Sequence, residues 1–150
     1  MLYLLCNLLG IMWKELTEEE RDLLMTDLSG RIKYDTVLDV KDEGEIYLAG
    51  VNWWNEVEVK NYSTTLYPID DVRPYLRRVC DLSEKERKEY ERFHWRHHHE
   101  WDGHSTYTDY VESNDVFEYL NWCNAHYLDK LGLIDKGLAR VAKEGMYKTV

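Results

Sequence analysis

The sequence predicts a single α+β domain in which a three-stranded antiparallel meander is packed by about four helices. Three observations lead to this fold class. The chain has 150 residues, 44% of them hydrophobic, which is enough to form one sizeable core spanning residues 1–150. Hydrophobic residues alternate with polar ones at strand spacing in one region. Elsewhere they recur at helical spacing behind capping motifs.

The first 15 residues allow three interpretations. Residues 1–13 are apolar except for Asn7 and Gly10, but they have no basic leader region and are too short to span a bilayer. Their helical periodicity favours a short helix docked on the domain. Alternatively, translation begins at Met12 and the preceding residues are a start-site extension. A membrane-surface anchor is the third interpretation.

The first helix is expected to begin after Thr17. Thr17 and Glu20 have the spacing of a capping box, in which each side chain binds an amide of the first helical turn. Gly30 is expected to end the helix by taking the left-handed conformation. The apolar stripe of this helix consists of Leu23, Leu24 and Leu28.

The meander is expected to follow directly. Residues 31–41 alternate between apolar and polar side chains, and only Val37 breaks the pattern. A turn signal at 42–44 separates them from two further predicted strands at 46–51 and 56–62.

Three more helices are expected in the second half of the chain. Pro68 and Pro74 bracket a short helix that begins near Asp70, where a proline is still tolerated in the first turn. Its inward residues would be Tyr75, Leu76 and Val79. Ser83 and Glu86 repeat the capping box and open a longer helix that reaches about His98, and a last helix runs from about 114 to 128.

The charge and cysteine content limit the classes of partner. The chain has 29 acidic and 19 basic residues, a net charge of -10 that disfavours nucleic acid as a partner unless basic residues gather on one face. Three cysteines without a C-x-x-C pair suggest neither a disulfide framework nor a thiolate zinc site, so a cytoplasmic location fits best. The sequence does not indicate an oligomeric state.

A histidine-rich segment, residues 94–104, contains the candidate metal ligands. His94 and His98 are four residues apart, a spacing that lets two imidazoles on one helix face hold zinc. Asp102 or His104 could add a ligand. With an open coordination position, this site would make the protein a small metal-dependent hydrolase or nuclease. The alternative is structural, with His94 and His97 at a core boundary and the others exposed.

The same helix carries a basic stripe on its opposite face. Its candidate binding residues, together with the neighbouring Trp95, are Lys85, Lys88, Arg92 and Arg96. Glu84 lies four residues before Lys88, which is typical of solvated surface ion pairs. A second interpretation joins the stripe to Arg73, Arg77 and Arg78 as a patch for phosphate or an acidic partner, with Trp95 stacking on a base.

Two other groups of residues are candidates for binding or catalysis. Trp53 and Trp54 are adjacent at a strand connection, so their rings point in different directions on an extended chain and one ring is expected to be exposed as a candidate interface anchor. His126 could pair with Asp129 or with Cys123, but no spacing ties them to a nucleophile or to each other as a catalytic unit. We therefore assign no catalytic residues.

Four segments of the chain carry a resemblance to known sequences. They are residues 73–77, residues 82–86, residues 120–139 and residues 144–147. From Leu16 onward the chain resembles a family of small uncharacterised proteins encoded by anaerobic gut bacteria, their prophages and their phages. The histidine run is not part of that pattern. The resemblance implies a phage or mobile-element setting and supplies no catalytic residues.

Two classes of function follow from the sequence. The first is a non-enzymatic accessory or binding protein that acts on a host or phage protein, which fits the small size, the acidity and the many aromatic residues. An acidic surface that mimics nucleic acid is a special case. The alternative is the metal-dependent hydrolase or nuclease described above.

Overall fold

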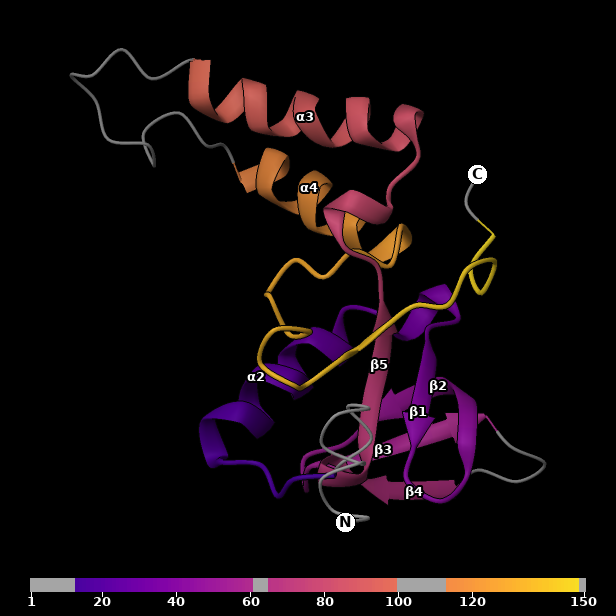
Figure 1. The fold of residues 1–150 in the computed structure, drawn as a ribbon. Helices are drawn as coiled ribbons and strands as arrows, with labels where there is room; N and C mark the ends of the chain where they lie inside the picture. The colour runs from indigo at the N-terminus through magenta and orange to yellow at the C-terminus, as the bar shows by residue number, and fades with distance from the viewer. Residues whose placement is uncertain (1–12, 61–64, 100–112, 149–150) are drawn as a thin grey trace.

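A six-stranded sheet with the strand order β4-β3-β2-β1-β5-β6 is the centre of the structure (Figure 1). This computed structural model describes residues 13–60, 65–99 and 113–148, although not the side chains of 94–99 and 113–115. The described elements are α2 (Glu18–Ser29), η1 (Ile32–Tyr34), β1 (Val37–Val40), β2 (Gly44–Val51), β3 (Glu56–Lys60), β4 (Thr65–Pro68), η2 (Ile69–Asp71), β5 (Val72–Leu76), η3 (Val79–Asp81), α3 (Glu84–His99), α4 (Ser113–Ala125) and β6 (Arg140–Val141). Elements labelled η are short 3₁₀-helices.

The sheet is mixed and larger than the predicted meander. Strands β1 to β4 pair antiparallel in sequence order, β5 returns to pair with the free side of β1, and β6 adds a short parallel pairing to β5. The long strand β2 serves both halves of the sheet, since Gly44–Tyr47 pair with β1 and Tyr47–Val51 pair with β3. Its register shifts between Leu48 and Gly50, and β3 and β4 run across the direction of β1 and β5 (Figure 1).

The main core lies between the inner face of this sheet and α2. The sheet contributes apolar side chains from every strand of the β1–β3 region and from β5, and the loop between α4 and β6 closes the core with Leu133 and Leu138. The buried members include Leu16, Leu24, Leu28, Leu38, Val40, Leu48, Val57, Val59, Ile69, Val72 and Leu76. The expected first helix is thus confirmed, with its capping box and with Leu24 and Leu28 buried.

The C-terminal segment covers part of the outer face of the sheet. The Tyr147 hydroxyl accepts a hydrogen bond from Val37 N at 2.9 Å and donates one to Tyr75 O at 2.7 Å, so it bridges β1 and β5. Arg140 Nε lies 3.2 Å from Asp39 Oδ2 on the same face. Lys143 of the same segment pairs with Glu45 at the start of β2.

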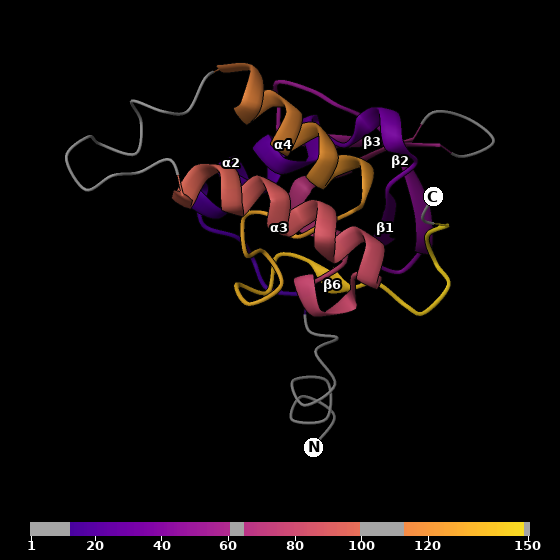
Figure 2. The ribbon, with the colours of Figure 1, turned by 90° about the horizontal axis from the view of Figure 1, so that it is seen from above.

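Helices α3 and α4 lie side by side beyond one end of the sheet (Figures 1 and 2). They enclose a second, smaller cluster of Leu82, Cys123 and Leu128, against which Tyr90, Tyr119 and Trp122 pack. The expected helices from Ser83 and from about 114 are confirmed. Tyr90 and Phe93 of α3 face α4, since both rings contact aromatic residues of that helix.

The prediction of a helix that begins near Asp70 is wrong. Residues 69–71 form one 3₁₀ turn and Val72–Leu76 form β5, in which all five residues are buried. Pro74 pairs with Leu38 inside the sheet. Proline fixes a φ that is compatible with an extended chain, and it lacks the backbone N–H that a helix needs. Burial on both faces of β5 favours the strand over the helix here. The described residues therefore contain three α-helices, against the four expected.

Two local expectations near Gly30 also need correction. Residues 32–34 form a 3₁₀-helix instead of a strand, and Asp35, with φ of 54°, delays the first strand until Val37. Gly30 has φ of -79°, so it does not end α2 by a left-handed turn. The glycine is needed for space, because a Cβ there would lie 2.8 Å from Asn124 Nδ2. The interpretations of residues 1–12 lie outside the described residues.

Candidate functional site

The connection between β2 and β3 is a tightly braced turn that presents two tryptophans. We call residues 52–56 the tryptophan turn. Asn52 Oδ1 accepts hydrogen bonds from Trp54 N at 3.0 Å and from Glu56 N at 3.1 Å, and Asn52 N donates to Glu56 O at 3.1 Å. Asn55 adopts the left-handed conformation with φ of 55°, which asparagine tolerates. These contacts fix the direction of the chain on both sides of the two rings.

The turn is also fastened to the strand pair beside it. Ile69 N donates to Asn55 O at 2.8 Å, and Glu56 pairs with Pro68 across the β3–β4 ladder. The Asn52 side-chain amide donates to Glu56 Oε1 at 3.1 Å. Asn52 and Glu56 are therefore bonded within the turn, and the side chains that the turn exposes are the two indoles and Asn55.

Both indoles are turned to solvent. Trp53 is 96% exposed and Trp54 is 77% exposed. Trp53 and Trp54 make no ring stacking or cation–π contact with any residue in the described parts of the chain. The sequence predicted that one ring is exposed, and the structure exposes both. Adjacent exposed tryptophans are costly to solubility and are typical of interface anchors.

The basic stripe of α3 is a solvated face over its described part. Lys85, Lys88 and Arg92 are exposed, and Lys88 Nζ lies 3.7 Å from Glu84 Oε1. The side chains of Trp95 and Arg96 lie outside the described residues. The stripe stays a candidate binding surface, without a bound or converging group that defines a site.

The joined patch with Arg73 and Arg77 is wrong. Arg73 is only 1% exposed and donates to the carbonyl oxygens of Gly137, Asp70, Val72 and Lys14. Burial, with Arg140 nearby, lowers the pKa of Arg73 to about 10. Arg77 is engaged as well.

Arg77 makes a bidentate pair with Glu86, at 2.7 and 2.9 Å. Of the three added arginines only Arg78 is exposed, and it lies beside Asp81. Sequence spacing could not reveal the burial of these arginines, because partners such as Lys14 O, Gly137 O and His126 O come from distant segments.

The predicted metal ligands cannot be placed as a group. His94 and His98 belong to α3 by their backbone, but their side chains lie outside the described residues, as do Asp102 and His104 entirely. In the rest of the described chain, no three His, Cys, Asp or Glu side chains gather as metal ligands. Zinc binding at the histidine run stays a prediction.

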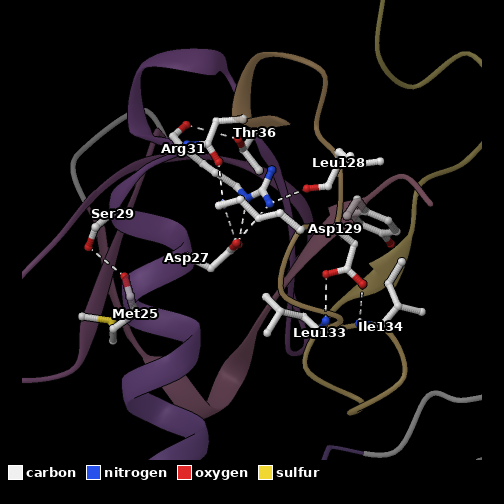
Figure 3. Close-up of polar contacts among 12 residues, drawn as sticks. Met25, Asp27, Ser29, Arg31, Thr36, Leu128, Asp129, Leu133 and Ile134 are labelled. Atoms are coloured by element: carbon white, nitrogen blue, oxygen red, sulfur yellow. Dashed lines mark hydrogen bonds and ion pairs between the residues drawn. The ribbon is translucent and has the colours of Figure 1, made fainter. Parts of the chain in front are cut away.

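The residues around His126 are committed to structure. Asp129 accepts hydrogen bonds from Leu133 N and Ile134 N at 2.7 and 3.0 Å, which shapes the loop after α4 (Figure 3). The His126 ring stacks on Trp122 with a centroid distance of 4.1 Å. Cys123 is fully buried, and burial raises the pKa of its thiol. A buried neutral thiol is a poor nucleophile, so these residues do not form a catalytic pair.

A polar network that sequence reasoning missed lies beside this loop. Asp27 and Arg31 are four residues apart on the chain, fully buried, and joined by hydrogen bonds of 2.7 and 3.0 Å, and Arg31 also donates to Leu128 O at 2.6 Å (Figure 3). Lys130 Nζ lies 2.9 Å from Asp27 Oδ1 and 2.6 Å from Asn124 Oδ1. The i, i+4 spacing of Asp27 and Arg31 was the available signal.

One surface hollow elsewhere is lined largely by groups already in use. It has a volume of about 490 Å³ and is lined by Arg77, Asp81, Lys143 and Tyr147 among others. Arg77 is paired with Glu86, Lys143 with Glu45, and Tyr147 with the sheet backbone. The hollow therefore presents no converging free polar groups of the kind that a ligand site needs.

Comparison with known proteins adds no assignment: no protein-family model, no curated protein and no solved structure matches this chain. None of the helices in the described residues is long and apolar enough to cross a membrane. The tryptophan turn is the feature of the described structure that fits an interaction site best.

Proposed function

We propose that this protein is a non-enzymatic accessory or binding protein, of phage or mobile-element origin, that docks on a host or phage protein through the tryptophan turn. The observation that carries the proposal is the exposure of Trp53 and Trp54, at 96% and 77%, on a turn whose backbone is internally bonded. Tryptophan is the residue most enriched among binding hot spots, because its large ring excludes water from a protein interface.

The rigidity of the turn supports this role. Binding costs conformational entropy when loops must become ordered, and a turn that is already fixed by Asn52 and by Ile69 N avoids most of that cost. The rings project from a hairpin instead of lining a hollow. A projecting anchor suits insertion into a protein surface better than enclosure of a small substrate.

The state of the potential catalytic groups also favours binding over chemistry. Within the described residues, Cys123 is buried with a raised pKa, and Asp129 is saturated by backbone amides. Arg73 and Arg77 are held by carbonyl oxygens and by Glu86. Each of these four side chains therefore has a structural role in the folded protein.

Affinity capture from host lysate tests the proposal. The full-length protein, tagged away from the histidine run, is compared with a Trp53→Ala/Trp54→Ala variant by quantitative mass spectrometry. We expect one saturable protein partner whose recovery falls at least about tenfold in the variant, because two hot-spot residues together contribute more than about 1.4 kcal/mol.

The matched control is Phe117→Ala, which removes a 64% exposed ring from α4. This control should retain the partner. Circular dichroism should show both variants folded, since the replaced rings are exposed. Equal capture by the wild type and the tryptophan variant would contradict the docking role of the turn.

A further inference from the structure

We infer that the partner meets the tryptophan turn with a basic surface, whose arginine or lysine side chains stack on Trp53 and Trp54. This inference rests on the proposed docking function and adds the chemistry of the partner. It is carried by two observations: the charge of the segments joined to the turn, and the absence of any cation on the two rings within the described residues.

Hydrogen bonds link the tryptophan turn to the start of α2 by way of residues 68–71. Residues 68–71 contact the turn through Ile69 N, which donates to Asn55 O, and they contact the start of α2 through Asp70, which accepts from Leu16 N at 3.3 Å. Residues 14–21, 56–58 and 68–71 are therefore neighbours of the turn or of one another. We call these three segments the acidic end.

The acidic end has an excess of carboxylates. Its acidic residues are Glu15, Glu18, Glu19, Glu20, Glu56, Glu58, Asp70 and Asp71, and its basic residues are Lys14 and Arg21. Both cations are already paired, Lys14 with Glu20 at 2.6 Å and Arg21 with Asp70 at 2.7 Å. Glu58 and Asp71 form no ion pair with any described residue. The field around the tryptophan turn thus attracts cations and repels anions.

The chain itself contains an example of the contact we infer. The Trp13 ring contacts two guanidinium groups, with the Cζ atoms of Arg73 and Arg140 each 5.1 Å from a ring centroid. Guanidinium groups stack on indole faces through both cation–π attraction and planar contact. Trp53 and Trp54 offer the same faces, with carboxylates nearby to neutralise the incoming charge.

Two other classes of partner fit the turn less well. A sugar stacked on indoles needs several free polar side chains beside the rings. Those of Asn52 and Glu56 are bonded to each other and to the turn backbone, so the turn offers a sugar only the exposed amide of Asn55. A membrane surface that carries anionic lipids would be repelled by the acidic end. A basic protein segment can both stack on the two indole rings and neutralise the carboxylates of the acidic end.

Fluorescence anisotropy with labelled peptides tests the inference on the full-length protein. The probes are three heptapeptides in which glycine alternates with arginine, glutamine or glutamate. We expect saturable binding of the arginine peptide alone, weakened at least about fivefold by Trp53→Ala/Trp54→Ala and unchanged by Phe117→Ala. Glu58→Gln, which retains both rings, should also weaken binding, and high salt should reduce it.

Several results would overturn the inference. These are no binding of the arginine peptide, equal binding of the glutamine peptide, binding that the tryptophan variant retains, or stronger association with neutral phosphatidylcholine vesicles. Failure of the basic-surface inference can be distinguished from failure of the proposed docking function. If the lysate partner still depends on Trp53 and Trp54 while the arginine peptide does not bind, only the basic-surface inference falls.

Discussion

The Tyr147 hydroxyl shows how one polar atom can complete a sheet. It takes the place of a backbone group between β1 and β5, bonded to Val37 N and Tyr75 O, while the ring stacks on Tyr127 with centroids 3.6 Å apart. Burial raises the pKa of this hydroxyl, so it remains a neutral donor and acceptor. The C-terminal segment is thereby fixed to the outer face of the sheet.

Tyr147→Phe should lower the free energy of unfolding by about 1–3 kcal/mol, because one amide and one carbonyl lose their partner while the ring is kept. Urea denaturation followed by circular dichroism measures the change. Tyr47→Phe is the matched control, since Tyr47 is 50% exposed, and it should have almost no effect. Equal stability of the two variants would show that water replaces the Tyr147 hydroxyl at no cost.

Asp27 has a comparable role in the main core. Burial alone would raise the pKa of Asp27, but the charges of Arg31 and then Lys130 lower it, so the carboxylate stays ionised (Figure 3). It neutralises two cations that have little access to solvent, since the side chains of Arg31 and Lys130 are 0% and 9% exposed.

Asp27→Asn should destabilise the protein by about 3 kcal/mol, because two buried cations lose their counter-charge. Asp22→Asn, an exposed change on the same helix, is the control and should lie within about 0.5 kcal/mol of the wild type. The unfolding midpoint in guanidinium chloride measures both. A loss below 1 kcal/mol for Asp27→Asn would mean that the network relaxes around the neutral amide.

At the scale of elements, the start of α3 joins a local motif to a distant partner. Glu86 accepts a hydrogen bond from Ser83 N at 2.9 Å, while Ser83 Oγ accepts from Glu86 N at 3.2 Å, as the capping box predicts. Arg77 then binds the same carboxylate from the segment after β5. Arg77, and to a smaller extent Ser83, lower the pKa of Glu86 to about 2.

This depressed pKa predicts an acid-dependent loss of stability. The contribution of Glu86 is fully present above its ordinary pKa of 4.5 and is lost as pH falls towards about 2. Glu86→Gln should be less stable than the wild type by about 3 kcal/mol at neutral pH, and the difference should shrink over that window. Urea denaturation between pH 2 and pH 6 measures it at about half-unit steps.

The exposed neighbour Glu84 provides the control for this profile. Glu84→Gln, at a side chain that is 87% exposed, should follow the wild-type profile. A constant difference between Glu86→Gln and the wild type down to pH 2 would exclude the ionised Glu86 as its cause.

The sequence predicted the capped helices well, but it did not predict the short buried strand β5. The Thr17 and Ser83 motifs act within four residues, so their hydrogen bonds can be recognised from spacing alone. β5 contains Pro74 and the charged Arg73. It is a strand because β1 pairs with it, and because carbonyl oxygens that include those of the distant Lys14 and Gly137 bind the arginine. Such long-range partners are invisible in a local pattern.

At the scale of the whole molecule, the structure has two cores of unequal size. The sheet and α2 share the larger cluster, and α3 and α4 share the smaller one of Leu82, Cys123 and Leu128. Arg77 helps to connect them, because its backbone donates to Tyr127 O and accepts from Asp129 N, while its side chain binds Glu86. A small core with few buried residues gives a lower free energy of local opening.

Native-state hydrogen exchange should therefore show α3 and α4 opening at a lower free energy than β1 and β5. Leu82→Ala should increase exchange in these two helices by about tenfold or more, since it removes a side chain that is 5% exposed from the smaller core. The amides of β1 should change much less. Uniform acceleration across both parts would mean that the protein unfolds as one cooperative unit.

The candidate site followed the same division between local and long-range information. The adjacent tryptophans and the strands on either side of them were apparent from residue order, which was enough to predict an exposed ring. The acidic end was not, because it gathers carboxylates from the start of α2, from β3 and from η2. Only the folded chain places these segments next to one another.

The sequence by itself determined the α+β class, the two capped helices and the projection of the tryptophan turn, because each depends on hydrogen bonds or side-chain periodicity within a few residues. The tertiary structure decided the six-stranded sheet, the strand conformation of β5 and the burial of Arg73. These depend on pairing and desolvation between segments far apart in the chain. A guanidinium can bind a ligand at the surface or form hydrogen bonds to carbonyl oxygens in the interior, and its surroundings in three dimensions decide which.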